Sequence, residues 1–382
     1  MSMERTRFPY MFWAHDQSAR TPHVLTQSGM PAADPALFAG IGGIDLGHPS
    51  ESALPEVEAR LAEKFGVDRS RVIVTLGASG GMHLAAARWF RPGTRVAVDR
   101  PSYEPFRALP AHFGAQTVEV PRRLEDGWSL DPGAVRAALA GAKGPGHVFF
   151  ANLHNPTGAR AKAGELRELA AAAAEHGGKL IVCEVYMEYA PPAERLHAFR
   201  IAPNGVSIGS LTKAYGVGPL RAGWMILGEE AAAERASLVD TLYLDYVDPP
   251  TVALRAYARA LAELEALARP IARVEAESRP IWERWLRETE GIQALVPTRG
   301  IIAFPRVEGV SDTRGLCEFL VREHQVDVVP GEFFGAPGHI RVGCAQPPEL
   351  LRAGLERLAA GIAAFRSSLA SPPRVGAAPR AS

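Results

Sequence analysis

The chain has 382 residues, of which 47% are apolar and 22% are charged, and its formal net charge at pH 7 is zero. This is an ordinary globular composition, and the chain is long enough to bury more than one hydrophobic core. A net charge of zero provides no global attraction to nucleic acid or to an acidic membrane, and the apolar runs are too short for a transmembrane helix, so neither partner is expected.

Short apolar strands alternate with helices up to residue 227. The first strand, at 71–75, is followed by a glycine-rich turn at 77–81 and a helix near 82–90. An alanine-rich helix at 166–176 ends at Gly177-Gly178. Short apolar strands separated by helices favour an α/β fold with a mainly parallel sheet that is covered on both faces. Further strands are predicted at 95–99, 147–151, 180–183, 206–209 and 224–227.

The pattern changes after residue 250. One long helix rich in Ala, Leu, Glu and Arg is predicted, followed by a smaller α+β domain. The helix is expected at 251–290, and the smaller domain contains predicted strands at 301–304 and 339–342 and helices at 313–323 and 348–365. The predicted organisation is an N-terminal arm, a large domain, a small domain and a disordered tail, at residues 1–45, 46–285, 286–370 and 371–382.

Cysteine usage and the N-terminus indicate a reducing compartment. Cys183, Cys317 and Cys344 are odd in number and far apart, so they form neither a disulfide framework nor a zinc spacing. The first 20 residues lack the pattern of a signal peptide. We therefore expect a cytoplasmic protein. The histidines also show no metal spacing; His83 is expected to pack within its helix, and His154 to lie at a strand end near the site.

The strongest chemical signal is Ser210-Leu211-Thr212-Lys213-Ala214-Tyr215-Gly216, with Arg221 eight residues after the lysine. A lysine on a turn between apolar residues is partly desolvated, which lowers its pKa and frees its amine to attack a carbonyl. Ser210 and Arg221 offer the hydroxyl and the guanidinium fork that suit a phosphate. A lysine that can form a Schiff base beside such a cradle suggests pyridoxal phosphate. The alternative is a surface lysine in a loop with a structural arginine.

This stretch resembles the S-x-[ST]-K-x-[YF]-G…R-x-G-[WY] signature of the class I/II aminotransferases, which are fold-type I pyridoxal-phosphate enzymes. Further segments match in the family's order, so the resemblance covers residues from about 45 to about 365. It implies that Lys213 forms the Schiff base with pyridoxal 5′-phosphate and that Ser210 and Arg221 hold the phosphate. It also implies a homodimer with shared active sites.

Two turns that follow strands match the family's cofactor contacts. Gly77-Ala78-Ser79-Gly80-Gly81 places backbone N–H groups at a helix N-terminus, which is a potential anion site. The resemblance assigns phosphate binding to Gly77, Ala78 and Ser79; the alternative is a plain strand-to-helix turn. In Pro101-Ser102-Tyr103, the ring of Tyr103 takes the place of the family's aromatic residue that stacks on the cofactor, whereas loop packing is the alternative.

Three more residues take functional places in the family pattern. Asn155, in Asn155-Pro156-Thr157-Gly158, matches the residue that donates to the cofactor's phenolic oxygen and borders the substrate. Tyr186 matches the catalytic tyrosine that bonds the same oxygen. Arg341 matches the arginine whose fork binds the substrate α-carboxylate, for which a lysine would not substitute. A strand-surface arginine is the alternative for Arg341.

The chain departs from the family at one position. The family has Asp-Glu-x-Tyr at the end of a strand, where the Asp pairs with the pyridine nitrogen, but this chain has Cys183-Glu184-Val185-Tyr186. A thiol has a pKa near ~8.5 and is a weak donor, so it is expected to leave that nitrogen neutral. Glu184 is no substitute, because strand alternation directs it to the opposite face. Cofactor binding is unaffected by this change, but fast amino transfer is in doubt.

The resemblance implies amino transfer between an α-amino acid and a 2-oxo acid, with Lys213 as the base that moves the proton of Cα. Two alternatives remain: a pyridoxal-phosphate lyase or cyclase that tolerates a weaker electron sink, and a non-catalytic relative that binds the cofactor. His48, in Gly47-His48-Pro49, lies where many relatives have a tyrosine that reaches the partner subunit's phosphate, although a simple loop histidine fits equally well. The substrate's side chain is left open.

Overall fold

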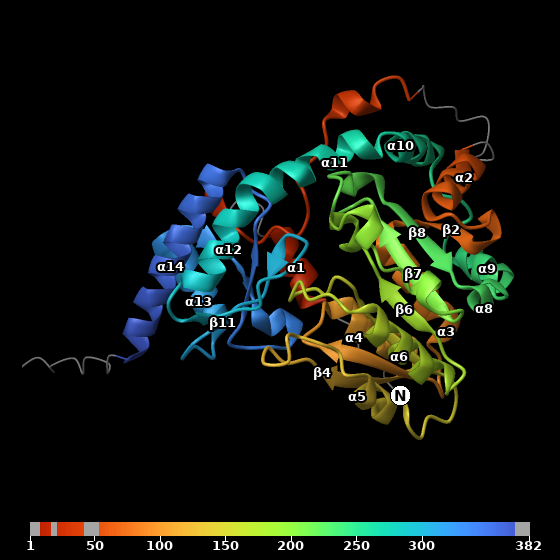
Figure 1. The fold of residues 1–382 in the computed structure, drawn as a ribbon, viewed down its shortest axis with the longest axis horizontal. Helices are drawn as coiled ribbons and strands as arrows, with labels where there is room; N and C mark the ends of the chain where they lie inside the picture. The colour runs from red at the N-terminus through yellow and green to blue at the C-terminus, as the bar shows by residue number, and fades with distance from the viewer. Residues whose placement is uncertain (1–7, 17–20, 42–52, 371–382) are drawn as a thin grey trace, which may run out of the picture.

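The computed structural model describes residues 8–16, 21–41 and 53–370. The expectations for His48 and for the tail at 371–382 concern residues outside these ranges. Much of the chain surrounds one seven-stranded sheet with the order β2-β8-β7-β6-β5-β3-β4 (Figure 1). Its strands are β2 Val72–Leu76, β3 Arg95–Arg100, β4 Gln116–Pro121, β5 Gly146–Ala151, β6 Leu180–Cys183, β7 Gly205–Ser210 and β8 Ala222–Leu227.

The predicted mainly parallel sheet is confirmed. Only β8 runs antiparallel to its neighbours β2 and β7 in this sheet, and the other neighbouring strands are parallel. Side chains of β5 alternate between two cores: Phe149 packs against Phe90 at the end of α3 (Gly77–Trp89), while Val148 and Phe150 join Leu169 of α6 (Ala163–Ala174). Because both faces are buried, the strands are apolar throughout instead of alternating with polar residues.

Two helix predictions were wrong. The glycine-rich stretch expected as a turn is the first part of α3, which follows β2 directly. Its glycines let the helix approach the sheet closely, since a Cβ on Gly81 would lie 2.7 Å from Cγ2 of Ile208 in β7.

The single helix expected at 251–290 is broken at Glu263. Pro270, which lacks an N–H donor, precedes a π-helical turn, Val274–Ser278. The helical segments on either side of these interruptions are α10 Thr251–Ala262, α11 Leu264–Arg273 and α12 Arg279–Glu288.

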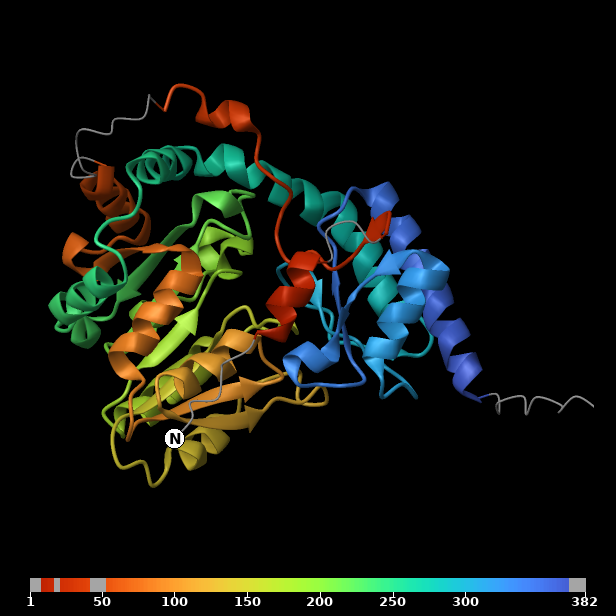
Figure 2. The same ribbon diagram turned by 180° about the vertical axis from the view of Figure 1, so that it is seen from behind.

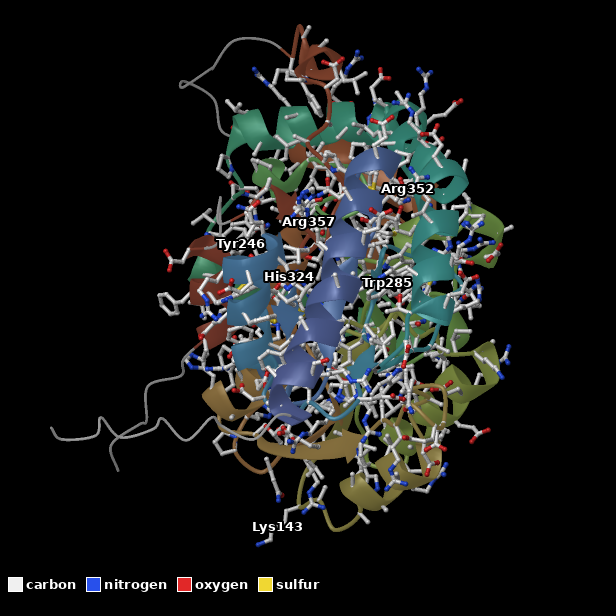
Figure 3. All side chains as sticks on the ribbon, turned by 90° about the vertical axis from the view of Figure 1, so that its left-hand side faces the viewer. Lys143, Tyr246, Trp285, His324, Arg352 and Arg357 are labelled. Atoms are coloured by element: carbon white, nitrogen blue, oxygen red, sulfur yellow. The ribbon has the colours of Figure 1, made fainter. Side chains whose placement is uncertain are left out.

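The C-terminal part is a smaller α+β unit. A three-stranded antiparallel sheet has the order β10-β14-β13, and α14 crosses its outer side between Trp285 and His324 (Figure 3). Trp285 donates from Nε1 to the Leu355 carbonyl at 3.0 Å, which fixes α12 against α14. The elements are β10 Ile302–Ala303, β13 Val329–Pro330, β14 Ile340–Gly343, α13 Thr313–Phe319 and α14 Pro348–Ala370.

The N-terminal arm crosses between the two parts. Helix α1 (Pro9–Asp16) lies between the large sheet and the smaller unit, as the two opposite views show (Figures 1 and 2). The arm then adds β1 (His23–Val24) in parallel to β12 (Val326–Asp327). Within the described ranges, no helix is long and apolar enough to cross a membrane. The domain boundaries at residues 45, 285 and 370 stay predictions.

Candidate active site

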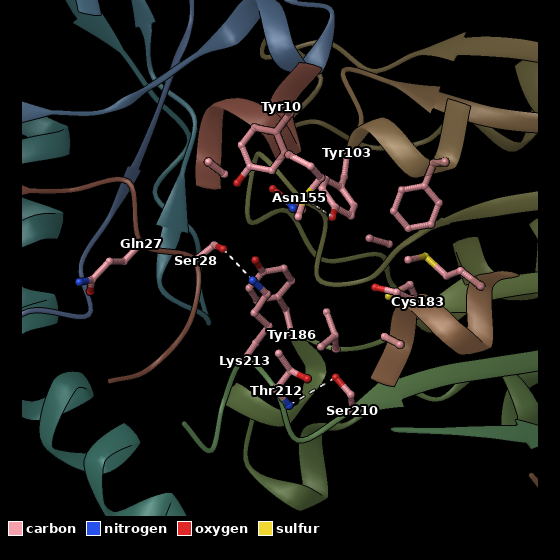
Figure 4. A pocket seen from close by; sticks show the side chains of 18 of the residues that line it. Tyr10, Gln27, Ser28, Tyr103, Asn155, Cys183, Tyr186, Ser210, Thr212 and Lys213 are labelled. Carbon is pink, nitrogen blue, oxygen red and sulfur yellow. Dashed lines mark hydrogen bonds between the residues drawn. The ribbon is translucent and has the colours of Figure 1, made fainter. Parts of the chain in front are cut away.

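A cavity of about 560 Å³ opens where the ends of β5, β6 and β7 meet helix α1 and the arm (Figure 4). Most of the residues predicted from the sequence line it, although they are spread from residue 78 to residue 221. They are Ala78, Ser79, Tyr103, Asn155, Cys183, Tyr186, Ser210, Lys213 and Arg221. Gly77 and Arg341 lie directly behind this lining, in contact with Arg221 and Asn155 respectively.

Lys213 lies on the turn after β7, and its side chain enters the cavity. Its Nζ bonds the hydroxyl of Ser28 at 2.9 Å. Burial, together with the positive charges of Arg341 and Arg221, lowers the pKa of Lys213 to about 8. The backbone carbonyl of Lys213 accepts from the Tyr189 hydroxyl and the Met30 N–H, both at 2.7 Å. A fixed amine with a depressed pKa is suited to attack a carbonyl.

Several donors at one end of the cavity converge as a phosphate would require. Arg221 has a left-handed backbone with φ 52°, and its Nη2 lies 3.5 Å from the Ser79 hydroxyl. Gly77 also has a positive φ, 69°, and a Cβ there would lie 2.7 Å from Nη2 of Arg221. The Ser210 hydroxyl is buried, and the Thr212 hydroxyl has no hydrogen-bond partner among the described residues. Unsatisfied donors beside a helix N-terminus and a guanidinium suit an anion.

Arg341 forms the opposite end. It lies on β14 with 1% of its surface exposed and donates to Oδ1 of Asn155 at 3.1 Å, to the Tyr10 hydroxyl at 2.9 Å and to the Thr26 carbonyl at 3.1 Å. Its Nε has no partner, and no carboxylate in the described part of the chain forms an ion pair with it. A buried guanidinium without a counter-charge favours the binding of an anion such as a carboxylate.

Cys183 ends β6 and faces the cavity. Burial raises the pKa of its thiol to about 12, so the group is neutral at physiological pH. Glu184 faces away, as strand alternation predicts: it is bonded to Nδ1 of His197 at 2.5 Å and to the Ser207 hydroxyl at 2.6 Å. No aspartate or glutamate lines the cavity in the described ranges. The position at which the family pattern has an aspartate thus holds an uncharged thiol.

The two tyrosines of the site remain protonated. Burial raises the pKa of Tyr186 to about 12, and it also raises that of Tyr103. The Tyr186 hydroxyl lies beside that of Ser28, and both residues line the cavity, where their hydroxyls can bond a ligand. The ring of Tyr103 meets that of Tyr10 edge-on at 5.9 Å, which leaves Tyr103 as a wall of the cavity.

The sequence did not reveal the residues that the arm contributes. Tyr10, Thr26 and Ser28 reach Arg341 and Lys213 across more than 180 positions of sequence. The aromatic cluster at 8–13 was the one available signal, and nothing marked Ser28.

His154 and His83 lie outside the cavity lining, which His15 of helix α1 joins. His154 is buried beneath it, bonded to the Thr157 hydroxyl at 2.7 Å and 3.1 Å from Oδ2 of Asp99. His83 pairs with Asp245 of α9 (Arg235–Asp245) at 3.0 Å, so it links two elements and does not simply pack within its own helix.

The residues present fit pyridoxal phosphate. The cavity joins a reactive amine, an aromatic wall, unsatisfied hydroxyls and a cationic cradle at one end. Among the described residues, no group of His, Cys, Asp and Glu is arranged to hold a metal ion.

Comparison with known proteins identifies the class. The family model "Aminotransferase class I and II" matches residues 31–358, and the chain therefore belongs to that family. Its cofactor is pyridoxal 5′-phosphate, and its fold is that of the fold-type I aminotransferases.

The individual relatives agree with this assignment. Capreomycidine synthase of Streptomyces vinaceus is 32% identical, with 88% of this chain and 87% of the relative covered. The arginine–pyruvate transaminase of Pseudomonas aeruginosa is 28% identical, with 78% of each covered. Among solved structures, a double mutant of Thermus thermophilus aspartate aminotransferase matches with a TM-score of 0.77 at 25% identity, covering 94% of this chain and 97% of that one. An aminotransferase from Streptococcus suis gives 0.83 at 22% identity, over 95% and 99%, which supports the fold alone.

Proposed function

We propose that Lys213 and Arg341 carry out the family's reaction in this chain, the transfer of an amino group between an α-amino acid and a 2-oxo acid. The observation that carries the proposal is that a cavity holds an amine with a depressed pKa and has a buried guanidinium without a counter-charge directly behind its lining. The first group suits covalent attachment of an aldehyde cofactor, and the second suits a carboxylate. Bound pyridoxal phosphate supplies the electron sink for breaking a bond at Cα.

Different residues of the site bind the substrate, move the proton and hold the phosphate. The fork of Arg341 binds the α-carboxylate and thereby orients Cα toward Lys213, whose amine takes the proton from Cα and would pass it on to the cofactor. Asn155 and Tyr186 are placed to donate to the ligand, since both line the cavity and Asn155 contacts Arg341. Ser79, Ser210 and Arg221 hold the phosphate end. Helix α1 covers the site and limits the access of water.

The working form is a cytoplasmic homodimer. Large apolar side chains are exposed near the end of α9 and the start of α10: Leu244 is 89% exposed, Val247 68% and Tyr243 54%. Such a group of exposed apolar residues marks a protein interface. The three cysteines are all unpaired, which suits a reducing compartment.

A second activity, carbon–heteroatom lyase or cyclase chemistry, is favoured by one observation. Cys183 offers no charge to the cofactor's ring nitrogen, so the electron sink is weaker than in relatives with an aspartate. One relative is named a synthase and not a transaminase. Such an enzyme would release ammonia or a cyclised product in place of an amino acid.

A screen of amino donors separates these functions. The purified protein, loaded with pyridoxal phosphate, is incubated with each common amino acid and with either pyruvate or 2-oxoglutarate, and Lys213→Ala serves as the control. Mass spectrometry follows new amino acids, oxo acids, ammonia and cyclised products. We expect a new amino acid that depends on the oxo acid acceptor. Products that form without the acceptor would assign a lyase or cyclase, and cofactor binding without turnover would assign a binding protein.

A further inference from the structure

The structure places a hydroxyl group next to the amine nitrogen of Lys213. We propose that Ser28 of the N-terminal arm holds the Lys213 amine and shares its proton while that amine serves as the base. The hydroxyl oxygen of Ser28 lies 2.9 Å from Nζ of Lys213, and the two residues are 185 positions apart (Figure 4). This inference rests on the proposed role of Lys213 and adds a residue to it.

The arm packs directly against Lys213, and hydrogen bonds and close contacts hold it there. The Met30 N–H donates to the Lys213 carbonyl at 2.7 Å. A Cβ on Gly29 would lie 3.3 Å from the same carbonyl oxygen and 3.4 Å from Cδ of Lys213, so a side chain there would crowd the lysine. The segment that carries Ser28 therefore lies directly along Lys213.

The arm is also anchored on the side facing the smaller unit. Leu25 donates from its N–H to the Asp327 carbonyl at 2.9 Å and accepts from the Gly343 N–H at 2.8 Å. Gln346 donates from Nε2 to the Val24 carbonyl at 2.9 Å. Since residues 24, 25 and 30 are all fixed by hydrogen bonds, the position of Ser28 between them is defined by the fold.

The charges around Nζ explain why a hydroxyl matters there. Arg341 and Arg221 both disfavour the protonated amine, and the nearby Cys183 thiol is neutral. When a proton leaves Cα, its electron pair stays with the substrate and the proton forms an ammonium on Nζ. That ammonium needs an acceptor, and the Ser28 oxygen is in place to provide one. Hydrogen bonds to charged groups are stronger than neutral ones.

The first test measures the amine itself, without turnover. In full-length protein freed of cofactor, the rate at which acetic anhydride modifies Lys213 is followed against pH by peptide mass spectrometry. Ser28→Ala and Ser28→Gly remove the acceptor for the charged form of the amine. We therefore expect the pH at which Lys213 is modified at half its maximal rate, the midpoint, to fall by about one pH unit. Ser28→Thr keeps a hydroxyl and should keep the midpoint. Ser237→Ala, which removes an exposed hydroxyl on α9, is the matched control.

The second test uses the holoenzyme and an amino donor deuterated at Cα. Loss of the Ser28 hydroxyl should slow the proton step, so kcat should fall about tenfold, the isotope effect on kcat should rise and KM should change little. A midpoint and an isotope effect equal to those of Ser237→Ala would overturn the proposal. If the wild-type protein transfers no amino group, the proposed function fails, whereas the midpoint of Lys213 still decides whether Ser28 holds the amine.

Discussion

At the scale of single residues, Arg341 is the clearest sign that the site binds an anion. Its guanidinium is almost fully buried, yet its partners are an amide oxygen, a phenol and a backbone carbonyl. None of these neutralises the charge. Burial of a cation without a counter-charge is costly, so binding of a carboxylate relieves a cost that the free protein carries.

Replacing Arg341 by alanine should therefore damage substrate binding more than cofactor binding. Loss of a buried, charged, two-pronged contact costs about 2–5 kcal/mol, which corresponds to a rise in KM for the amino acid of at least about thirtyfold. Cofactor affinity, measured by absorbance titration, should stay near that of the wild type. Arg341→Lys should recover little, because an ammonium lacks the fork. Unchanged substrate kinetics in Arg341→Ala would show that another group binds the carboxylate.

We expect Cys183 to set the electronic state of the bound cofactor. Because its thiol is neutral and no carboxylate among the described residues lines the cavity, we expect the ring nitrogen of bound pyridoxal phosphate to be unprotonated. Cys183→Asp should protonate it and speed amino transfer, although the gain is limited by the lack of supporting hydrogen bonds. Nitrogen-15 NMR of the labelled cofactor measures both states. A protonated nitrogen in the wild-type protein would rule this idea out.

At the scale of elements, the junction of β2 and α3 shapes the phosphate end. Gly77 has φ 69°, and a Cβ would come within 2.7 Å of the Arg221 guanidinium. Gly77→Ala should strain the backbone and displace Arg221, so we predict at least a tenfold loss of affinity for pyridoxal phosphate. Gly80→Ala, in the same helix, places its Cβ at an ordinary 3.4 Å from Cβ of Leu76 and should bind normally. Equal cofactor affinities for the two variants would contradict this account.

The elements also show how far the sequence could be interpreted. The strands that end in Cys183 and Ser210, and the strand that precedes Asn155, were predictable, because each is an apolar run followed by polar residues at one sheet edge. The start of α3 was missed because glycine disfavours helices, while here its small size allows close packing on β7. Beyond the aromatic cluster that contains Tyr10, the contributions of Tyr10 and Ser28 had no sequence signal, because they depend on an arm that folds back over residues far along the chain.

At the scale of the whole molecule, the site exists only where three parts meet. The large sheet supplies Lys213 and the phosphate end, the smaller unit supplies Arg341, and the arm joins them through Tyr10 and Ser28. The arm's hydrogen bonds thus link the smaller unit to the lysine.

The proposed homodimer can be tested at its exposed apolar residues. A dimer of this 41.0 kDa chain should have twice that mass in light scattering. The double variant Leu244→Asp/Val247→Asp should shift it toward the monomer, because charges in an apolar interface are costly. Leu350→Asp, at a leucine on α14 that is 50% exposed, is the matched control and should remain dimeric. A monomeric wild-type protein would exclude the homodimer. A dimer in both variants would place the interface elsewhere.

We propose that Lys213 carries the cofactor, and one measurement tests this directly. The holoenzyme is reduced with borohydride, digested and mapped by mass spectrometry, which finds the lysine to which pyridoxal phosphate is attached. Lys213 has the depressed pKa of about 8 and enters the cavity between the phosphate cradle and Arg341. We predict one modified peptide, containing Lys213, and none from Lys213→Ala. A label on another lysine, or no label in a protein that still transfers amino groups, would contradict the account.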